Sequence, residues 1–361
     1  MCISAAHFQP VSFSRLRKLS PTRKLIAFVA ALYLFYSIVN FFLARSVTSV
    51  LSPLSTLDEI DGLELVVAST KNDNTSWLYE YLPEFKKNIY VTDNPRAKLT
   101  VPKNKGREAM VYLTYIIDHY DHLPKHLIFI HPERYQWHND DPLFDNVPLL
   151  QNFQVSFLAK QGYLNLRCVW LVGCPEEIRP LIDAHINLGK LHTGAIYQDS
   201  FEELFPGTPV PQKVGVSCCA QFGVTREQIL KRPKEEYEHF RQWLLNTSLP
   251  DELSGRVFEY SWHVIFGRKA VYCPSARDCY CKQYGLCNLR CRNVGTCEKR
   301  YIFPPFIRLP KEWPNSDWYG RPLHDEFPFW LPLPEGVEDR KDADNVYWKH
   351  WDNFDHWGWD G

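Results

Sequence analysis

The amino-acid sequence predicts an α/β domain with a mostly parallel sheet flanked by helices. An N-terminal transmembrane helix precedes this domain, and a small cysteine-rich module follows it. Short apolar runs typical of buried strands alternate with amphipathic stretches typical of helices, which favours a parallel sheet. Residues 25–44 carry no charged side chain. Six of the 11 cysteines lie within residues 273–297, a density typical of a disulfide-bonded segment.

The segment 25–44, LIAFVAALYLFYSIVNFFLA, predicts a transmembrane helix because its length suffices to cross a hydrocarbon core of about 30 Å. Basic residues precede it at Arg15, Arg17, Lys18, Arg23 and Lys24. Only Arg45 follows closely, so the positive-inside rule places the tail 1–24 in the cytosol and predicts a type II single-pass topology. A cleaved signal peptide is the alternative, but its apolar core usually has about 7 to 15 residues.

The chain after this segment divides by composition into four parts. They are a stem (45–60), the α/β domain (61–270), the disulfide-rich module (271–300) and a Pro/Trp-rich extended tail (301–361). The formal net charge of −1 argues against a nucleic-acid partner, which would select a basic surface. The topology predicts a lumenal or extracellular domain on the Golgi, the endoplasmic reticulum or the plasma membrane. It leaves the oligomeric state open.

The first elements of the α/β domain are short. Residues 63–68 and 88–92 predict buried strands, and residues 77–82 predict a short helix that stops near Pro83. A basic loop then leads into a helix whose apolar positions share one face, at Ala109, Leu113, Ile116, Ile117 and Tyr120. The apolar run 127–130 follows, and it is typical of a strand buried on both faces.

The later elements are predicted from the same periodicities and from signals at their ends. They are a fourth strand (168–172), a strand and turn (214–224), helices over 225–245 broken at Pro233, and a helix over 253–266 closed by Gly267. Thr225 and Gln228 have the spacing of a capping box at a helix start.

The clustered cysteines predict three disulfides within the module, with fifteen possible pairings. A zinc site is the alternative, but zinc modules favour C-x2-C pairs and the gaps here are five, one, five, three and five residues. Cys168, Cys174, Cys218 and Cys219 lie in the α/β domain. A bridge between these two pairs is plausible from the sequence.

The loop after the strand 127–130 is the first candidate site. His138, Asp140 and Asp141 offer one imidazole and two carboxylates, which would suit Mn²⁺ or Mg²⁺ held together with a substrate diphosphate. The alternative is a polar turn whose carboxylates cap a helix or pair with Arg134.

The start of the central helix is the second candidate, because a helix N-terminus attracts anions through its free N–H groups. The residues expected to bind a nucleotide diphosphate there are Lys103, Lys105, Gly106 and Arg107. The alternative is a solvated surface on which Glu108 pairs with Lys105.

The third candidate set is catalytic and comprises Glu259, His263 and His131. Glu259 and His263 are one helical turn apart, which suits a general base with an orienting partner or two metal ligands. His131 ends the strand 127–130, and the ligand crevice of an open α/β sheet lies at such strand ends. The alternative is that these are ordinary core residues, since the H-E-x-x-H form is missing.

Several motifs are similar to those of a known family. They are VVASTKNDNTSWL, KGREAMVYLTYIIDHYDHLP, FIHPERYQWHNDDP, GYLNLRCVWLVGCPEEIRP, SCCAQFGVTREQI, SGRVFEYSWHVIFG and CPSARDCYCKQYGLC. Together they resemble the DUF3431 family, common in fungi and functionally uncharacterised, from about residue 64 to about residue 314. The Gly-Arg-Glu helix start, the Tyr-Asp turn and the strand ending in His also resemble GT-A glycosyltransferases, in which a corresponding segment carries a GRD motif. Their D-x-D metal motif is replaced here by Asn139-Asp140-Asp141.

The second resemblance implies a GT-A-like fold and glycosyl transfer from a nucleotide sugar to a glycan acceptor. Arg107 and the Gly106 helix end would neutralise the diphosphate, Asp140 and Asp141 would hold the divalent ion, and Glu259 would be the base. A membrane ectodomain that binds glycans or proteins without catalysis is the alternative, and a hydrolase is a third option.

Overall fold

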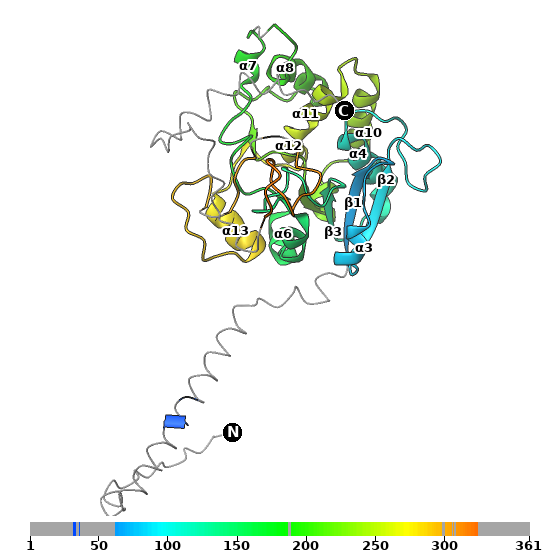
Figure 1. Ribbon diagram of the computed structural model, residues 1–361. Coiled ribbons are helices and arrows are strands. Elements are labelled where there is room, and N and C mark those ends of the chain that lie inside the picture. The colour runs from blue at the N-terminus through cyan, green and yellow to red at the C-terminus, as the bar shows by residue number, and fades with distance from the viewer. Residues whose placement is uncertain are drawn as a thin grey trace, which may run out of the picture. The chain divides into compact units, whose positions relative to one another are not determined.

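The computed structural model describes residues 62–323, apart from 187–188, 298–299, 305 and 307, together with Leu32, Tyr33 and Tyr36 (Figure 1). The chain divides into two compact units, Met1–Pro53 and Leu54–Gly361. Within the described residues, no helix has the length and apolar character needed to cross a membrane. Within the predicted span 25–44, the structure describes only Leu32, Tyr33 and Tyr36, and these three residues are helical.

The second unit contains a five-stranded sheet in the order β2-β1-β3-β6-β4, of which Figure 1 labels β1, β2 and β3. Its strands are β1 (Leu63–Ser69), β2 (Lys86–Val91), β3 (His126–Ile130), β4 (Tyr163–Asn165) and β6 (Phe222–Thr225). β1 pairs in parallel with β2 and β3, whereas β6 is antiparallel to both β3 and β4. Four strands therefore run in one direction and β6 runs against them, which confirms a mostly parallel sheet within a mixed α/β fold.

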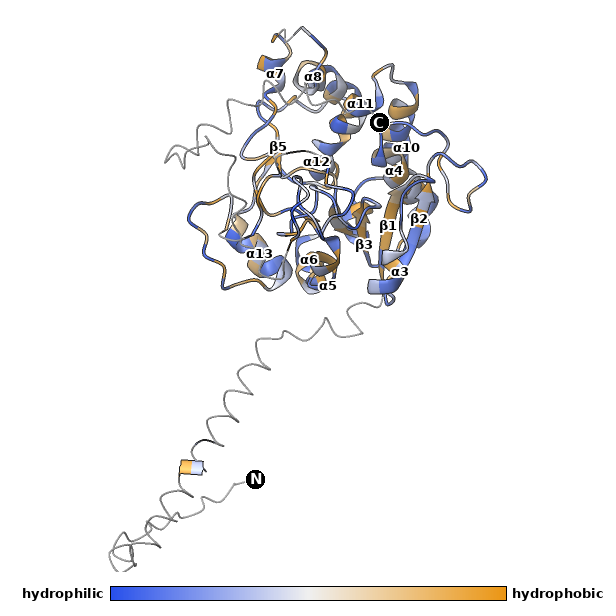
Figure 2. Ribbon diagram, viewed as in Figure 1, coloured by the Kyte–Doolittle hydropathy of each residue, from blue (hydrophilic) through white to orange (hydrophobic). Residues whose placement is uncertain are grey.

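Alternate side chains of the central strands enter two separate cores, one on each face of the sheet. In β3, Leu127 and Phe129 join one core, and Ile128 and Ile130 join the other. All four side chains are fully buried, which confirms the prediction of a strand covered on both faces. Figure 2 shows the same apolar character along β1.

The first core lies between the sheet and a helical layer that contains the central helix. Its helices are α4 (Glu108–Asp118), α8 (Thr193–Leu204), α10 (Lys234–Asn246), α11 (Asp251–Glu259) and α12 (Trp262–Ile265). α4 contacts β1 on one side and α10 on another. Every residue from Ala109 to Ile117 is consequently buried, not only the single apolar face that the periodicity predicts.

The second core is covered by shorter helices on the opposite face. They are α3 (Trp77–Tyr81), α5 (Asn146–Gln151), α6 (Val155–Gln161) and α13 (Ala276–Tyr284). The remaining described elements are η2 (Tyr120–His122), α7 (Pro180–Asp183), α9 (Arg226–Ile229) and a parallel pair formed by β5 (Gly215–Val216) and β7 (Val271–Tyr272). The Thr225 side chain accepts a hydrogen bond from the Gln228 N–H, as the capping-box spacing predicts.

Three predicted elements are corrected by the structure. Residues 168–172 are not a strand, since the backbone N–H groups of Cys168 and Val169 donate to the Asp140 carboxylate and not to a neighbouring strand. The segment 214–224 separates into β5 and the start of β6. The predicted helix 253–266 is two helices, α11 and α12, with a break at residues 260–261.

The disulfides also differ from the predicted set. Two bridges do lie inside the cysteine-rich segment, Cys281–Cys287 and Cys291–Cys297. The other two cysteines of that segment, Cys279 and Cys273, form disulfides with Cys168 and Cys174 of the α/β domain. The prediction of three internal bridges is therefore wrong. The remaining bridge joins the sequence neighbours Cys218 and Cys219.

Candidate functional site

A cavity of about 600 Å³ lies where β1, β2 and β3 end. Ser69 and Thr70 line it at the end of β1, Thr92 follows β2 and His131 follows β3. The carboxyl ends of parallel strands are where α/β folds hold their ligands. The cavity thus occupies the edge of the sheet at which the sequence predicts a site.

Arg107 is the member of the predicted anion-binding set that reaches this cavity. It is the N-cap residue of α4, and its backbone has a positive φ of 56°. Lys105 contacts the Leu249 carbonyl and lies 3.5 Å from the Asp251 carboxylate. Lys103 is exposed and does not line the cavity.

Gly106 shapes the backbone that presents Arg107. Its φ is +66°, and a Cβ at this position would lie 2.4 Å from Leu244 Cδ1. Both the conformation and the space therefore require glycine. The missing side chain lets the start of α4 approach α10, and the Gly106 N–H donates to the Asp251 carboxylate across 3.4 Å.

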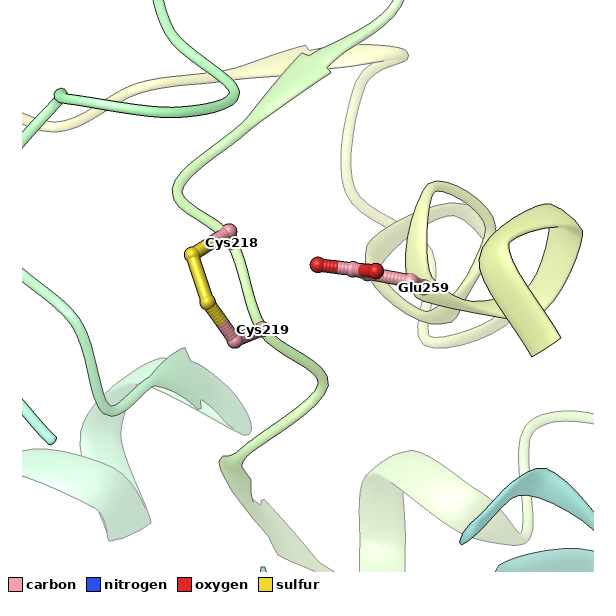
Figure 3. Close-up of side chains that lie close together, drawn as sticks. All are labelled: Cys218, Cys219 and Glu259. Atoms are coloured by element: carbon pink, nitrogen blue, oxygen red, sulfur yellow. A yellow bond between two sulfur atoms is a disulfide. The ribbon is translucent and has the colours of Figure 1, made fainter. Parts of the chain in front are cut away.

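Glu259 lies at the end of α11 and its carboxyl group points toward the Cys218–Cys219 disulfide (Figure 3). The pKa of this carboxyl is raised to about 7, chiefly by burial; Arg256 opposes the shift and the nearby Glu108 contributes to it. A carboxyl group with such a pKa exchanges a proton readily near neutral pH, as a general acid or base must.

Glu108 supplies a second carboxyl group to the same cavity. Burial raises the pKa of Glu108 to about 7, and Arg107 partly opposes this. From the sequence, a surface pairing of Glu108 with Lys105 was the alternative to an anion site at this helix start. The structure instead turns Glu108 into the cavity, because the first turn of α4 faces the end of the sheet.

The imidazoles of His131 and His138 contact each other in the cavity wall, with their Nδ1 atoms 3.0 Å apart. Burial lowers the pKa of His131 to about 4 and also lowers the pKa of His138. Both rings are therefore neutral near pH 7, with one Nδ1 donating and the other accepting. The His131 Nε2 atom is buried and has no hydrogen-bond partner within the described residues.

Asp140 and Asp141 do not line the cavity with His138. The Asp140 carboxylate accepts hydrogen bonds from Cys168 N, Val169 N and the Tyr280 hydroxyl, at 2.6, 3.0 and 2.6 Å. Asp141 accepts from the Leu143 N–H and lies 3.7 Å from an Arg300 nitrogen. Both carboxylates thus have internal partners and do not converge with the imidazole on one position.

His263 lies apart from the cavity as well. It is fully buried, and its Nε2 atom bonds the Ala270 carbonyl at 2.9 Å. The break between α11 and α12 interrupts the helix on which Glu259 and His263 would share a face. His263 is therefore placed as a core residue, which was the alternative considered from the sequence.

The opposite wall of the cavity is apolar. It consists of the Cys218–Cys219 disulfide with Trp137 and Val172, which pack together as one cluster. None of these residues was predicted as a site residue from the sequence. Nor was Arg256, which lines the cavity together with Arg107, Glu108 and Glu259. Arg256 precedes Glu259 by three residues, which places both on one side of α11. This spacing could have identified Arg256 as a neighbour of Glu259.

A second cavity of about 1380 Å³ shares lining residues with the first, among them Asp73, Arg107 and His138. Its other walls are rich in aromatic side chains: Trp77, Tyr81, Tyr135, Phe306 and Trp313. Charged side chains line both cavities, and aromatic side chains are concentrated in the second.

A family model described as "Protein of unknown function (DUF3431)" matches residues 65–282. No curated protein and no solved structure matches the chain. The matched range includes the lining residues of the inner cavity.

Proposed function

This chain belongs to the DUF3431 family, and we propose that it transfers a glycosyl group from a nucleotide sugar to a glycan acceptor. The observation that carries the proposal is the combination, in one cavity at the strand ends, of Arg107 and Arg256 with the carboxyl group of Glu259. The mixed sheet, with one reversed strand beside the parallel ones, is compatible with the GT-A-like fold that the sequence resembles.

The two arginines suit the chemistry of the donor. A nucleotide sugar leaves as a nucleoside diphosphate, and negative charge builds up on that group as the glycosidic bond breaks. Arginine side chains bind phosphate oxygens through paired N–H groups and remain charged at every working pH. Arg107 and Arg256 would neutralise this charge, and the N-terminus of α4 would add its dipole.

Glu259 is the proposed base that removes the proton from the acceptor hydroxyl. Its pKa of about 7 lets it hold that proton and release it afterwards. The adjacent aromatic cavity is the proposed acceptor site, because aromatic rings pack against the apolar faces of sugar rings while hydroxyl groups bond the polar rim.

The predicted Mn²⁺ or Mg²⁺ would need His138, Asp140 and Asp141 as its ligands. His138, Asp140 and Asp141 do not fit such an ion, since both carboxylates already accept internal hydrogen bonds and neither lines the cavity that His138 lines. Within the described residues, one cluster of metal-ligating residue types is found, formed by Cys218, Cys219 and Glu259. Its two sulfurs are joined in a disulfide, so they are not thiolate ligands.

Ligand-dependent stabilisation tests the donor class. Thermal unfolding of the purified full-length chain is followed with a panel of nucleoside diphosphates, with and without Mn²⁺. A nucleotide that binds the folded state should raise its stability by about 2.7 kcal/mol at a hundredfold excess over Kd. A shift for one nucleotide supports the proposal and identifies the donor. Cooperative unfolding with no shift for any nucleotide contradicts it.

Glu259→Gln tests the catalytic step. Glycosyl transfer should fall by about 10²- to 10⁴-fold, while binding of the nucleoside diphosphate is retained. In the wild-type chain the rate should rise with pH through about 7, because the carboxylate form is the base. Glu238→Gln, at an exposed position on α10, is the matched control and should leave the rate unchanged. Equal rates for Glu259→Gln and the wild-type chain would remove Glu259 from the mechanism.

The aromatic cavity also favours a second candidate, a glycan-binding ectodomain without catalysis. Both candidates predict glycan binding, but only the transferase requires the nucleotide. Oligosaccharide binding that persists without any nucleotide shift or turnover would favour this second function.

We further propose that residues 25–44 anchor the chain in a secretory-pathway membrane with its α/β domain on the lumenal or extracellular side. The Asn74-Thr75-Ser76 sequon lies on the described surface and offers a test of this orientation. Glycosylation of Asn74, lost in Asn74→Gln, is the expected result. Protease digestion of the α/β domain from the cytosolic side of sealed vesicles would contradict the proposal.

A further inference from the structure

The disulfide between Cys218 and Cys219 has surroundings that differ from those of the other bridges. It lies in the turn between β5 and β6 and forms part of the cavity wall. Both residues are buried, with 2 and 5 % of their surface exposed, so a molecule reaches the sulfur atoms by way of the cavity. A small reagent can therefore approach this bridge in the folded chain.

A buried cation faces the sulfur atoms from the protein interior. The Nη1 atom of Arg167 lies 3.1 Å from Cys218 Sγ and 3.4 Å from Cys219 Sγ, and only 3 % of Arg167 is exposed. Its Nε and Nη2 atoms are buried without a hydrogen-bond partner among the described residues. The guanidinium group stacks on Tyr301, with 4.2 Å between Cζ and the ring centroid.

The groups that contact Arg167 Nη1 directly, the two sulfurs and the Trp137 carbonyl at 3.4 Å, carry no charge, and Glu259 interacts with Arg167 electrostatically. Buried cations in proteins are normally paired with an anion, since an uncompensated charge is costly in a medium of low polarity. A disulfide sulfur is only a weak acceptor, whereas a thiolate carries a full negative charge. Reduction of the bridge would place that anion directly beside Arg167.

A carboxyl group faces the same sulfurs from the other side. One ligand atom each of Glu259, Cys218 and Cys219 lie within 4.8 Å of one another (Figure 3). Thiol–disulfide exchange transfers protons as well as electrons, and a nearby carboxyl group can accept or return a proton. The burial that raises the pKa of Glu259 to about 7 suits it to this exchange.

Opening this bridge would leave the tertiary structure intact. Cys218 and Cys219 are adjacent, so their disulfide closes almost no loop and restricts the unfolded chain little. Cys168–Cys279 and Cys174–Cys273 instead join positions 111 and 99 residues apart. The vicinal pair can therefore change redox state while the long-range bridges preserve the fold.

We propose that Cys218 and Cys219 form a thiol–disulfide exchange site in the cavity, with Arg167 stabilising the Cys218 thiolate and Glu259 accepting the released proton. The electron donor is a small dithiol. Its first thiolate attacks Cys219 Sγ and breaks the Cys218–Cys219 bond, which leaves Cys218 as a thiolate beside Arg167. Its second thiol then displaces Cys219, and the donor departs as a cyclic disulfide.

The reaction balances in atoms and charge. One protein disulfide and one dithiol give one thiolate at Cys218, one thiol at Cys219, one donor disulfide and one proton, which Glu259 takes up. The charged groups around the pair are Arg167 and Glu259, and Arg107, Arg256 and Glu108 act on Glu259 in turn. Negative charge thereby moves from the Glu259 carboxylate to Cys218, on the wall that is apolar in the oxidised state.

Redox titration of the full-length chain tests the proposal. The chain is equilibrated with mixtures of reduced and oxidised dithiothreitol, free thiols are alkylated, and each cysteine-containing peptide is quantified by mass spectrometry. The Cys218–Cys219 peptide should be alkylated under conditions in which Cys168–Cys279 and Cys174–Cys273 stay oxidised and the circular dichroism spectrum is unchanged. A vicinal bridge that opens only when the chain unfolds would overturn the proposal.

Substitutions of Arg167 test its role beyond packing. In the reduced wild-type chain, the alkylation rate at this pair should follow a pH profile whose midpoint lies about 1 to 3 pH units below that of Arg167→Met, because an adjacent cation stabilises a thiolate. Arg167→Lys retains the charge and should restore a low midpoint. An identical pH profile in all three chains would overturn the assignment of Arg167. The redox titration of the wild-type chain tests the exchange site itself and does not depend on whether the variants fold.

Discussion

Asp140 has a structural function that its sequence neighbours do not reveal. Beside Asp141 and His138 in the sequence, it has the composition of a metal ligand. In the fold its two oxygens accept three hydrogen bonds, which bind the segment after β4 and the helix α13 to the loop after β3. Asp140 is thus an internal acceptor that joins three parts of the chain.

Asp140→Ala should therefore destabilise the fold. It leaves the N–H groups of Cys168 and Val169 and the hydroxyl of Tyr280 without their acceptor, at a total cost of roughly 2 to 5 kcal/mol in the free energy of unfolding. Urea denaturation measures the change. Asp121→Ala, at an exposed position, is the control and should stay within about 0.5 kcal/mol of the wild-type chain. An unchanged stability together with lost Mn²⁺ binding would instead support the metal site.

Four of the candidate residues named from the sequence lie together in the fold. Arg107, His131, His138 and Glu259 were all candidates, and the structure brings them to one cavity. Their position after strands or at helix ends was visible in the pattern of apolar runs. The direction of each side chain was not, because it depends on packing between segments far apart in the chain. For this reason the sequence did not show that Asp140 and His263 lie away from the cavity, or that Arg167 contacts the adjacent Cys218 and Cys219.

At the scale of the element, the packing of α4 against α10 determines where Arg107 lies. The N-terminal end of α4 approaches α10 so closely that Gly106 lies against Leu244. A helix end displaced by a bulkier residue would move both Arg107 and Glu108 relative to the strand ends. The precision of the cavity therefore depends on a glycine that does not line it.

Gly106→Ala should lower the free energy of unfolding by about 1 to 3 kcal/mol more than Gly207→Ala does. Both positions have a positive φ, of +66° and +76°, so both variants carry the conformational cost of a side chain there. A Cβ at Gly207 meets nothing within 4 Å, whereas a Cβ at Gly106 meets Leu244 Cδ1 at 2.4 Å. Chemical denaturation of the two variants measures the difference. Equal losses would show that the contact with Leu244 relaxes freely.

The elements themselves were predictable where periodicity is strong. The strands at 63–68 and 127–130 and the helix over 109–120 correspond closely to β1, β3 and α4. The segment 168–172 has the apolar content of a strand but forms no ladder, since the N–H groups of Cys168 and Val169 donate to the Asp140 carboxylate. Apolar content reports burial, and burial alone does not distinguish a strand from an irregular buried segment.

At the scale of the whole molecule, the long-range disulfides bind the cysteine-rich segment to the α/β domain. The sequence predicted a module closed on itself, because clustered cysteines are most simply paired with one another. The helix α13 instead packs in the same core as β1 and β3, and its Cys279 forms a disulfide with Cys168 of the α/β domain. Pairing depends on tertiary proximity, which cysteine spacing does not record.

Removing Cys168–Cys279 should cost more stability than removing Cys291–Cys297. The chain-entropy model gives about 4.8 kcal/mol for a loop of 111 residues and about 2.2 kcal/mol for a loop of six. The double variants Cys168→Ala/Cys279→Ala and Cys291→Ala/Cys297→Ala should therefore differ by about 2 to 3 kcal/mol. Thermal and chemical unfolding under oxidising conditions measure the difference. Equal losses would show that the long loop is already restricted in the unfolded chain.

The position of β6 has a consequence for the order in which a growing chain can fold. β6 lies between β3 and β4 in the sheet, yet it is the last of the five strands to be synthesised. The β2-β1-β3 portion can assemble once residue 130 has left the ribosome, whereas β4 has no partner strand until residues 222–225 emerge. Cys168 must wait longer still, since its partner follows 111 residues later. Synthesis of the domain thus passes through a long interval in which the edge of β3 is open and Cys168 is a free thiol.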